Sequence, residues 1–408
     1  MNWAKSEALA LTSYCPKSLF KEGSFQWPRE GLKYLGILFP SKMNEIVERN
    51  FDPLLRKISL DTDRWSTLFL SLWGKVNVLK MNCVPKLNYL LQSLPINVPG
   101  KYFKQFDRIC TKFLWNGKRA RMRLDKLQLP VERGGLGLPK LLFYHYAFST
   151  RHLAHWVLPP ERAPPWYQIE QLALSPLPPL SCLSTKKSPK AQAHPVISHL
   201  QETWNKICKI FNTNPYLNSE SSIWKNPKLH INKAPFLWKE WVNKGILKLG
   251  DLYKEGSIKS FDDLVVEFDL PRSTFWQYLQ LSHLLCGVFG SPRTLPPHSE
   301  LLGGTTMVFG TGHEASFYYS ELFMESMKVT NALKIVWERD LNLDIEEEEW
   351  DEICKNTTKM SKDTRIKLIQ FKIHNRFYWT PSRLQRLKEV LKRQLNAGSV
   401  RIHHRWAP

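Results

Sequence analysis

The sequence predicts a mainly α-helical protein that carries a small β-rich region at its amino end. Apolar residues recur at steps of three and four in several segments beyond residue 60, which is the spacing of one face of an α-helix. Short apolar runs bounded by Pro or Gly, typical of strands, gather in the first 60 residues. The chain has 408 residues, which is enough for two or three domains.

The overall composition is that of a globular protein. Hydrophobic residues make up 43% of the chain, which argues against wholesale disorder. No apolar run approaches the roughly 20 residues that span a bilayer, and the amino terminus carries no secretory signal. The seven cysteines are scattered without a C-x-x-C pair. We therefore expect reduced, mostly buried thiols in an intracellular protein, cytoplasmic and nuclear, without a disulfide framework or zinc site.

Positive charge is concentrated in one quarter of the chain. The net charge is +21, and residues 61–160 hold 16 Lys and Arg against 5 Asp and Glu. Such a concentration predicts a polyanionic partner at this quarter. A membrane surface would also attract it, but the apolar faces of these segments are needed for a core. Nucleic acid, RNA or DNA, is therefore the expected partner, with no membrane association.

The first 60 residues predict a compact β-rich piece. Ala8–Thr12, Phe25–Trp27 and Lys33–Phe39 are short apolar runs of the kind that form strands. We expect these runs to pair into a small sheet.

A long amphipathic helix is predicted after residue 60. Asp61 or Asp63 can cap its amino end, because a short carboxylate accepts the free N–H groups of a first turn. Pro85 predicts a stop or a kink, since it lacks an N–H. Lys75, Lys80 and Lys86 fall off the apolar stripe and are expected to be solvated. The stripe consists of Trp65, Leu68, Phe69, Leu72, Val76, Leu79 and Cys83.

The next predicted helix begins after Pro99 and carries an apolar stripe beside a basic one. The apolar stripe is Tyr102, Phe103, Phe106, Ile109, Cys110, Phe113 and Leu114, and the basic stripe is Lys101, Lys104, Arg108 and Lys112.

The densest charge follows as K-R-A-R-M-R-L-D-K at 118–126, from Lys118 to Lys126. Arg119, Arg121 and Arg123 alternate with apolar residues, so an extended segment would present three guanidinium groups on one face. Guanidinium groups suit phosphate oxygens and do not depend on base sequence. The alternative is a solvated edge strand that uses its charge against aggregation.

Two further stretches are interpreted as connections. G-G-L-G-L-P at 134–139 lacks the Gly-Lys-Ser/Thr ending of a phosphate loop, so it is predicted to be a turn before the next helix. Nine prolines between residues 159 and 195 predict a linker at a domain boundary. Beyond it a helical region is expected, with Trp276, Trp337 and Trp350 in its core.

The stretch around the first long helix resembles the thumb of reverse transcriptases of LINE-type (non-LTR) retrotransposons. The residues that carry this resemblance are R-W-S-T-L-F-L-S-L-W-G-K-V-N-V-L-K-M at 64–81 and P-K-L-N-Y-L-L-Q-S-L-P-I at 85–96. The R-G-G-L-G-L-P stretch at 133–139 is similar to a recurring connector of the same family. These motifs are long, and the resemblance covers nearly all of the chain.

Two shorter motifs ahead of the thumb extend the resemblance. N-W-A-K-S at 2–6 is similar to the palm segment where a lysine, here Lys5, lies near the incoming nucleotide. K-Y-L-G-I at 33–37 is similar to the primer-grip hairpin, which implies that role for Tyr34, Leu35 and Gly36.

The resemblance implies four consecutive regions. They are a palm remnant at 1–60, a helical thumb with a basic connector at 61–158, a Pro-rich linker at 159–199 and a helical carboxyl-terminal region at 200–408.

The catalytic carboxylates of such a polymerase are not found in the sequence. Polymerases of this type need paired carboxylates that hold two Mg²⁺ ions. The sequence Ser260–Asp263 is an apparent copy, but it has the pattern of a helix cap. The acidic run Glu346–Glu349 has the pattern of a solvated helix face. We therefore expect no catalytic residues, no bound cofactor and no polymerase activity from this chain alone, although the intact polymerase would need Mg²⁺.

No metal is expected at the carboxyl end either. His403 and His404 are adjacent, and without thiolate partners they cannot build a four-ligand site. The family pattern fades near Leu384, whereas the family continues into a Cys/His cluster. Because Met1 also falls inside what should be a continuous palm, we expect a reading frame truncated at both ends by gene decay, with a frameshift near residue 384.

The functional prediction is a nucleic-acid-binding fragment that grips template–primer or element RNA. One alternative is a domesticated helical scaffold that binds a protein through its aromatic-rich carboxyl half. Another is a non-functional pseudogene product. The predicted binding residues are Lys75, Lys80, Lys86, Arg108, Lys112, Lys118, Arg119, Arg121, Arg123 and Lys126.

Overall fold

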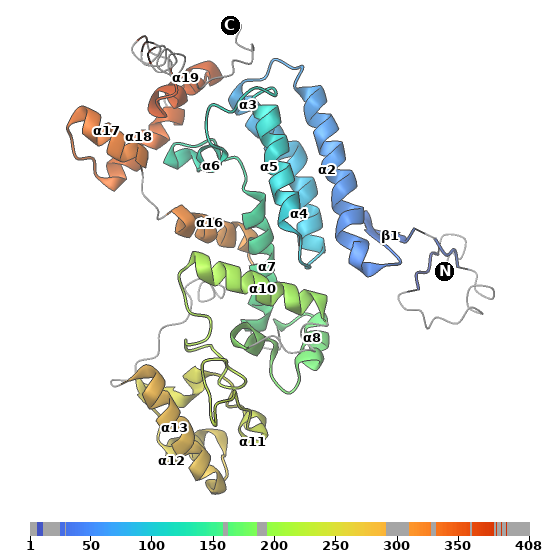
Figure 1. Cartoon of the computed structure of the whole chain (residues 1–408), viewed down its shortest axis with the longest axis vertical. Helices are drawn as coiled ribbons and strands as arrows, with labels where there is room; N and C mark the ends of the chain where they lie inside the picture. The colour runs from blue at the N-terminus through green and yellow to red at the C-terminus, as the bar shows by residue number, and fades with distance from the viewer. Residues whose placement is uncertain are drawn as a thin grey trace. The chain divides into compact units, whose positions relative to one another are not determined.

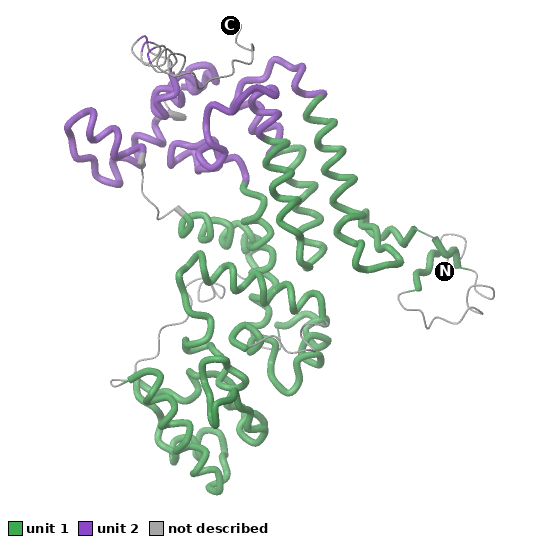
Figure 2. The backbone as a smooth tube through the Cα atoms, viewed as in Figure 1, with its two compact units in different colours: residues 1–63, 81–110, 140–330 green, residues 64–80, 111–139, 331–408 purple. Residues whose placement is uncertain are grey.

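The computed structural model is mainly helical, as the sequence predicts (Figure 1). It describes residues 6–10, 25–28, 30–157, 162–185, 194–290, 310–327, 332–359 and 361–378, together with the single positions 381, 385 and 389. The chain forms two compact units built from interleaved segments (Figure 2). Unit 1 comprises residues 1–63, 81–110 and 140–330, and unit 2 comprises residues 64–80, 111–139 and 331–408.

Unit 1 contains a β-hairpin at the position where the resemblance implies one, so the single strand predicted at Lys33–Phe39 is divided by a turn. Strands β1 (Leu32–Tyr34) and β2 (Ile37–Phe39) pair antiparallel, with Tyr34 opposite Ile37. Leu35 and Gly36 form the two-residue turn, with φ values of 47° and 83°. Positive φ at both positions is the geometry of a type I′ turn, whose twist matches that of the flanking strands.

The other predicted strands of the amino region do not form in the described residues. Glu7 and Gln26 make a single parallel bridge. Residues 11 and 12, the end of the predicted Ala8–Thr12 strand, lie outside the described residues.

The β-rich prediction is wrong for residues 46–60. They belong to helix α2 (Ile46–Trp65), which follows the short helix η2 (Met43–Glu45). Its buried residues Phe51, Leu55, Ile58 and Thr62 are spaced by four, three and four, the period of one helix face.

The predicted caps of the next helix are also misplaced. Asp61 and Asp63 lie in the last turns of α2, so neither begins a helix. Helix α3 (Leu72–Val78) begins instead at Ser71, whose Oγ accepts the Gly74 N–H at 3.1 Å. A hydroxyl at this position satisfies an N–H of the first turn that has no partner inside the helix.

The predicted single helix from 61 to 95 is therefore divided. A π-helical turn η3 (Leu79–Cys83) separates α3 from α4 (Val84–Ser93), which has Pro85 in its first turn. The sequence predicts a stop or a kink at Pro85, and the structure has a new helical segment that begins next to it, where the missing N–H of proline costs no hydrogen bond within α4. Leu68 and Phe69, expected on the apolar stripe, are exposed in the connection before α3.

Helix α5 (Gly100–Leu114) forms as predicted. All seven residues of its expected apolar stripe are buried, and the three lysines and one arginine of its basic stripe, Lys101, Lys104, Arg108 and Lys112, are exposed.

The middle of unit 1 is a set of packed helices. Helix α7 (Leu141–Val157) packs on α16 (Glu314–Met327), with the rings of Tyr144 and Tyr319 4.3 Å apart (Figure 1). It also contacts α4 and α10 (Pro195–Ile210).

Part of the predicted Pro-rich linker is folded in this set. Residues 162–185 contain α8 (Trp166–Leu174) and η6 (Pro179–Ser184), with Tyr167 and Cys182 buried. Short apolar runs between the prolines provide this core, which the proline count did not reveal.

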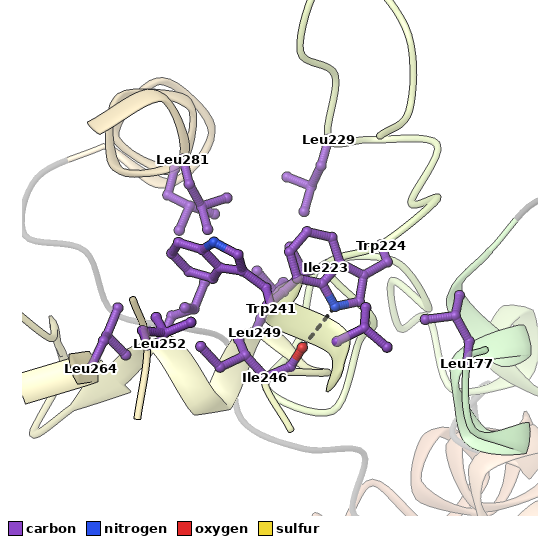
Figure 3. Packing of buried hydrophobic residues seen from close by; sticks show 13 residues of the cluster. Leu177, Ile223, Trp224, Leu229, Trp241, Ile246, Leu249, Leu252, Leu264 and Leu281 are labelled. Carbon is purple, nitrogen blue, oxygen red and sulfur yellow. Dashed lines mark hydrogen bonds between the residues drawn. The ribbon is translucent and has the colours of Figure 1, made fainter. Parts of the chain in front are cut away.

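Residues 223–289 form a further core within unit 1. Trp224 and Trp241 are fully buried in it, and the Trp224 Nε1–H donates to the Ile246 carbonyl at 2.8 Å (Figure 3). Its elements are α11 (Lys239–Asn243), η7 (Leu249–Leu252), β3 (Tyr253–Lys254), β4 (Ser257–Ile258), α12 (Phe261–Phe268), η8 (Arg272–Thr274) and α13 (Phe275–Phe289).

The predicted tryptophan core residues have different outcomes. Trp350 is buried, and Trp337 packs against its cluster in unit 2. Trp276 is 75% exposed, so its prediction as a core residue is wrong. Helix α13 buries Leu281 and Leu285 instead, and these lie on a different helix face.

Unit 2 combines the basic segment with the end of the chain. Helix α6 (Leu124–Gln128) and η4 (Val131–Arg133) join α17 (Ala332–Leu341), α18 (Glu347–Lys359) and α19 (Thr364–His374). Arg133 pairs with Asp351 at 2.9 Å, and the Asn375 Nδ2–H donates to the Gly134 carbonyl at 3.0 Å. The region predicted at 200–408 is thus divided between the two units.

The two acidic patterns are structural, as expected. Ser260 Oγ accepts the Asp263 N–H and the Asp263 carboxylate accepts the Ser260 N–H, each at 3.1 Å, which makes a capping box for α12. The Asp263 carboxylate also accepts the Ser260 Oγ–H at 2.6 Å, and this bond together with the one from the Ser260 N–H lowers the pKa of Asp263. Glu347–Glu349 occupy the first turn of α18, where negative charge is favourable. Within the described residues, no helix combines the length and the apolar character needed to cross a membrane.

Candidate nucleic-acid interface

The carboxyl end of α5 is closed by the side chain of Lys75. Lys75 is only 3% exposed as a residue, and its amine donates to the Phe113 carbonyl at 2.9 Å and to the Asn116 side-chain oxygen. The same amine lies 5.1 Å from the centre of the Phe113 ring. A cation at this position satisfies carbonyls that no helical N–H can reach and is attracted by the negative helix end.

The prediction that Lys75 is solvated is therefore wrong, and its burial gives no support to a phosphate contact. Both of its described acceptors belong to unit 2, and burial lowers the pKa of the amine because desolvation disfavours the charged form. Lys75 positions the chain that leaves α5 and has no exposed charge to offer a phosphate.

The chain leaves α5 through a left-handed turn. Asn116 and Gly117 have φ values of 51° and 71°, and the Gly117 N–H donates to the Lys112 carbonyl at 2.8 Å. The Lys118 N–H then donates to the Trp115 carbonyl at 2.9 Å. This is a typical helix ending, and it fixes where the basic residues begin.

The residues from Lys118 to Arg123, here called the basic segment, follow this turn. They form bends and no strand, so both the extended arrangement with three guanidinium groups on one face and the alternative edge strand are wrong. The tight turn precedes them and α6 starts directly after Arg123, which leaves no partner strand. The side chains of Lys118, Arg119, Arg121 and Arg123 are all exposed.

The charge of the basic segment is largely not neutralised within unit 2. Arg123 pairs with Asp125 at 2.8 Å, but Lys118, Arg119 and Arg121 form no ion pair with any residue that the structure describes. Three acidic residues of the unit form ion pairs with other basic residues. The pairs are Arg133–Asp351 at 2.9 Å, Lys334–Glu347 at 2.9 Å and Arg376–Asp340.

The glycine-rich connector after α6 is a packed turn, as predicted. The Gly135 N–H donates to the Pro130 carbonyl at 3.0 Å, and the Gly137 N–H donates to the Leu129 carbonyl at 2.8 Å. These N–H groups are therefore not free to cradle a phosphate. A Cβ on Gly135 would lie 2.0 Å from the Leu129 carbonyl oxygen, so the close approach requires glycine.

The remaining predicted basic residues have different settings. Lys80 is exposed on η3, and its Nζ lies 3.7 Å from the position that a Cβ on Gly137 would take. Lys126 is half-buried on α6. Burial of the His374 ring lowers its pKa to about 4, and the positive charge of Lys126 adds to this lowering.

Most of the predicted binding residues belong to unit 2. The other two, Lys86 and Arg108, belong to unit 1. Lys86 on α4 lies 4.0 Å from Asp61, and Arg108 is exposed on α5. Of the predicted set, the exposed members in unit 2 are Lys80, Lys112, Lys118, Arg119, Arg121 and Arg123.

The hairpin of unit 1 presents an apolar tip. Tyr34 and Leu35 are 61% and 72% exposed, and Leu35 adopts a left-handed conformation that is uncommon for a bulky residue. The turn is held from outside the hairpin, because the Tyr89 hydroxyl on α4 donates to the Leu35 carbonyl. Lys5, the other residue assigned from the palm motifs, lies outside the described residues.

Asn50 holds the second strand of the hairpin, β2, through its side-chain amide. Its Nδ2 donates to the Leu38 carbonyl at 2.8 Å, and its Oδ1 accepts the Leu38 N–H at 2.9 Å. The amide thus imitates a paired strand residue on β2. No local pattern in the sequence marks Asn50 or Tyr89, because their partners lie 12 and 54 residues away. The Asn116-Gly117 pair did carry a signal, since this pair is a common helix ending.

The described residues contain no group of three or more His, Cys, Asp and Glu side chains placed to hold a metal ion. No protein-family model matches the chain.

Proposed function

We propose that this chain binds nucleic acid through phosphate contacts and that the basic segment is the centre of the binding surface. The observation that carries the proposal is the exposed charge of Lys118, Arg119 and Arg121 without an acidic partner among the described residues. Guanidinium groups form paired hydrogen bonds with phosphate oxygens, and such contacts are independent of base sequence. The charge balance of residues 61–160 supports the same partner.

The resemblance to LINE-type reverse transcriptases gives the proposal a finer form. In it, the chain acts as the thumb-containing part of such a polymerase and holds template–primer or element RNA. The exposed Tyr34 and Leu35 at the hairpin tip would contact the primer strand with apolar surface. Arg108 and Lys112 on α5 would extend the phosphate contacts along the duplex.

A salt titration of binding tests the proposal. The logarithm of the affinity should fall linearly with the logarithm of salt concentration, with a slope of about −0.9 per phosphate neutralised on duplex DNA and about −0.7 on single strands. Changing Arg119, Arg121 and Arg123 together to Ala should reduce the magnitude of the slope by about two to three, roughly one for each lost contact. The lower value applies if Arg123 stays with Asp125.

The matched control is the triple change of Lys209, Lys228 and Lys239 to Ala. These lysines are exposed in unit 1 and outside the predicted set, so the net charge falls equally. The control should keep the slope of the unmodified chain. Equal slopes for the unmodified chain and the arginine variant would place the binding surface elsewhere, and a flat, weak titration of both would remove the proposal.

A scaffold that binds a protein partner is the second candidate. It is favoured by the exposure of Trp276, with Val266 at 85% exposed on the adjoining α12. Large apolar side chains in such positions are typical of interaction surfaces. A scaffold predicts weak nucleic-acid binding that changes little with salt, so the same titration separates the two functions.

A further inference from the structure

Unit 1 contains a pocket of about 460 Å³ that the nucleic-acid proposal does not use. It is lined by the end of α4, one face of α7, one face of α8 and the start of α10. Its volume lies in the range of small-molecule sites. The residues that define its chemistry are Phe148, Arg151, His152, His155, Trp166 and His194.

Among the described residues that line the pocket, one is a carboxylate, and both of its oxygens already have partners. Glu170 is buried, and its Oε1 lies 2.9 Å from His152 Nε2. Its Oε2 accepts the Trp156 Nε1–H at 2.7 Å. The negative charge of Glu170 is therefore already paired with side chains of the pocket wall. The other charged residue of the described lining is a cation.

That cation is Arg151, which is half-buried and forms no ion pair with any described residue. Its guanidinium carbon lies 5.6 Å from the centre of the Phe148 ring. The Glu314 carboxylate interacts electrostatically with Arg151, but it accepts the Gly310 N–H at 2.7 Å and forms no ion pair with Arg151. A half-buried guanidinium without a carboxylate gives the pocket a positive potential.

A second donor comes from the start of α10. The Ile197 N–H donates to His194 Nδ1 at 3.3 Å, so the neutral His194 ring carries its hydrogen on Nε2. His194 also lines the pocket and caps a 16-residue helix at its positive end. Arg151 and His194 together offer hydrogen-bond donors to an anionic group.

The rest of the lining suits a planar apolar body. The Trp166 ring is held between His152, at 4.1 Å between ring centres, and His155, at 5.2 Å. Leu91, Pro95 and Phe148 add apolar surface. A ring held by its neighbours loses little freedom when a ligand packs against it.

We propose that this pocket binds a small planar molecule that carries one anionic group, with a nucleoside monophosphate as the representative ligand. Arg151 and His194 receive the phosphate, and the base packs among Trp166, Phe148 and the neighbouring aliphatic residues. A free mononucleotide and the 5′-phosphorylated end of a strand share this chemistry. The site is separate in sequence from the basic segment, so neither proposal depends on the other.

Calorimetry of the full chain with adenosine monophosphate tests the site. The monophosphate should bind at least tenfold more tightly than adenosine or inorganic phosphate alone, because each of those supplies half of the recognised chemistry. Arg151→Gln should weaken binding at least tenfold, whereas the charge-matched Lys239→Gln, outside the pocket, should leave it unchanged. Equal binding to the unmodified chain and the Arg151→Gln variant would overturn the proposal.

Ser93→Trp provides a variant that keeps all the charges. Ser93 is exposed at the pocket, so a large ring there should obstruct the site without disturbing the core. Binding that survives this change, or no binding of the monophosphate to the unmodified chain at millimolar concentration, counts against the site. Competition by a 5′-phosphorylated oligonucleotide, compared with its 5′-hydroxyl form, assigns the ligand to a strand end; its failure assigns it to a free nucleotide.

Discussion

At the scale of single residues, burial decides what a lysine does. Lys75 and Lys80 are five positions apart and both basic, yet one closes the end of a helix and the other is exposed. The difference depends on whether carbonyl oxygens from a distant segment surround the amine. Charge in the sequence therefore overstates the number of phosphate contacts available.

We predict that Lys75→Met destabilises the protein by about 1–3 kcal/mol, because the Phe113 carbonyl and the Asn116 side chain lose a buried donor. Methionine keeps most of the apolar stem, so the change reports mainly on the amine. Urea unfolding measures the difference, and Lys239→Met, at an exposed position, should stay within about 0.5 kcal/mol. A Lys75→Met variant as stable as the control would contradict the capping role.

The same residue predicts a pH dependence. Burial lowers the pKa of Lys75 in the folded protein, so the unfolded chain binds more protons between the lowered value and the ordinary one. The contribution of Lys75 to the free energy of unfolding is then lowest at neutral pH. It rises as the pH increases from the lowered pKa to the ordinary one. The difference in stability between the unmodified chain and Lys75→Met should therefore widen from pH 7.5 to pH 10.

Two glycines of unit 2 allow the energetic cost of backbone strain to be measured apart from the cost of steric contact. Gly117 and Gly134 both have positive φ, but a Cβ on Gly117 meets nothing within 4 Å, whereas one on Gly134 would lie 2.6 Å from His374 Nε2. Gly117→Ala should cost about 1–2 kcal/mol from the left-handed backbone alone. Gly134→Ala should cost more, because it also displaces a buried ring. Thermal unfolding of both variants checks the order, and equal losses would contradict the close packing at Gly134.

At the scale of elements, the β1–β2 hairpin combines a conformational cost with an exposed apolar tip. Asparagine tolerates left-handed geometry better than leucine, and Asn-Gly is the preferred type I′ pair. Leu35→Asn should therefore raise stability by about 0.5–1 kcal/mol. In the proposed function it should also weaken binding to primed duplex, because the tip loses its apolar surface.

The control for this element is Leu60→Asn. Leu60 is an exposed leucine on α2 that belongs to no proposed site, so its change should leave duplex binding as it is. Unfolding curves and duplex affinities measured on both variants decide the matter. If Leu35→Asn stabilises the chain without weakening binding, the tip has no role in the primer contact.

At the scale of the whole molecule, distant segments fold as one unit. The glycine connector and α6 share unit 2 with α18 and α19, through Arg133–Asp351 and the Asn375–Gly134 hydrogen bond. The basic segment therefore depends on residues more than 200 positions further along the chain for its support.

Removing residues 331–408 should accordingly loosen residues 124–138. Hydrogen exchange should show lost amide protection there, because the contacts of Gly134 and Arg133 disappear, while α7 in unit 1 keeps its protection as an internal reference. Unchanged protection at 124–138 in the truncated chain would show that the shorter segments suffice.

The sequence by itself determined the local features. The helical period placed the face of α5, Pro85 marked a boundary between helical segments, the Ser260–Asp263 pattern gave a cap, and the glycines at 134–137 indicated a turn. Each of these depends on residues within a few positions of one another, so the chemistry that decides it is visible in a short window.

Only the tertiary structure decided which charged residues remain available and which segments fold together. Lys75 is buried because the Phe113 carbonyl, 38 residues away, accepts its hydrogen bond, and Asn50 holds β2 through contacts that no repeat in the sequence marks. Amphipathic spacing reports that a face is buried but not what buries it. The partner of each face is fixed only when the whole chain has packed, because burial is a property of contacts between distant segments.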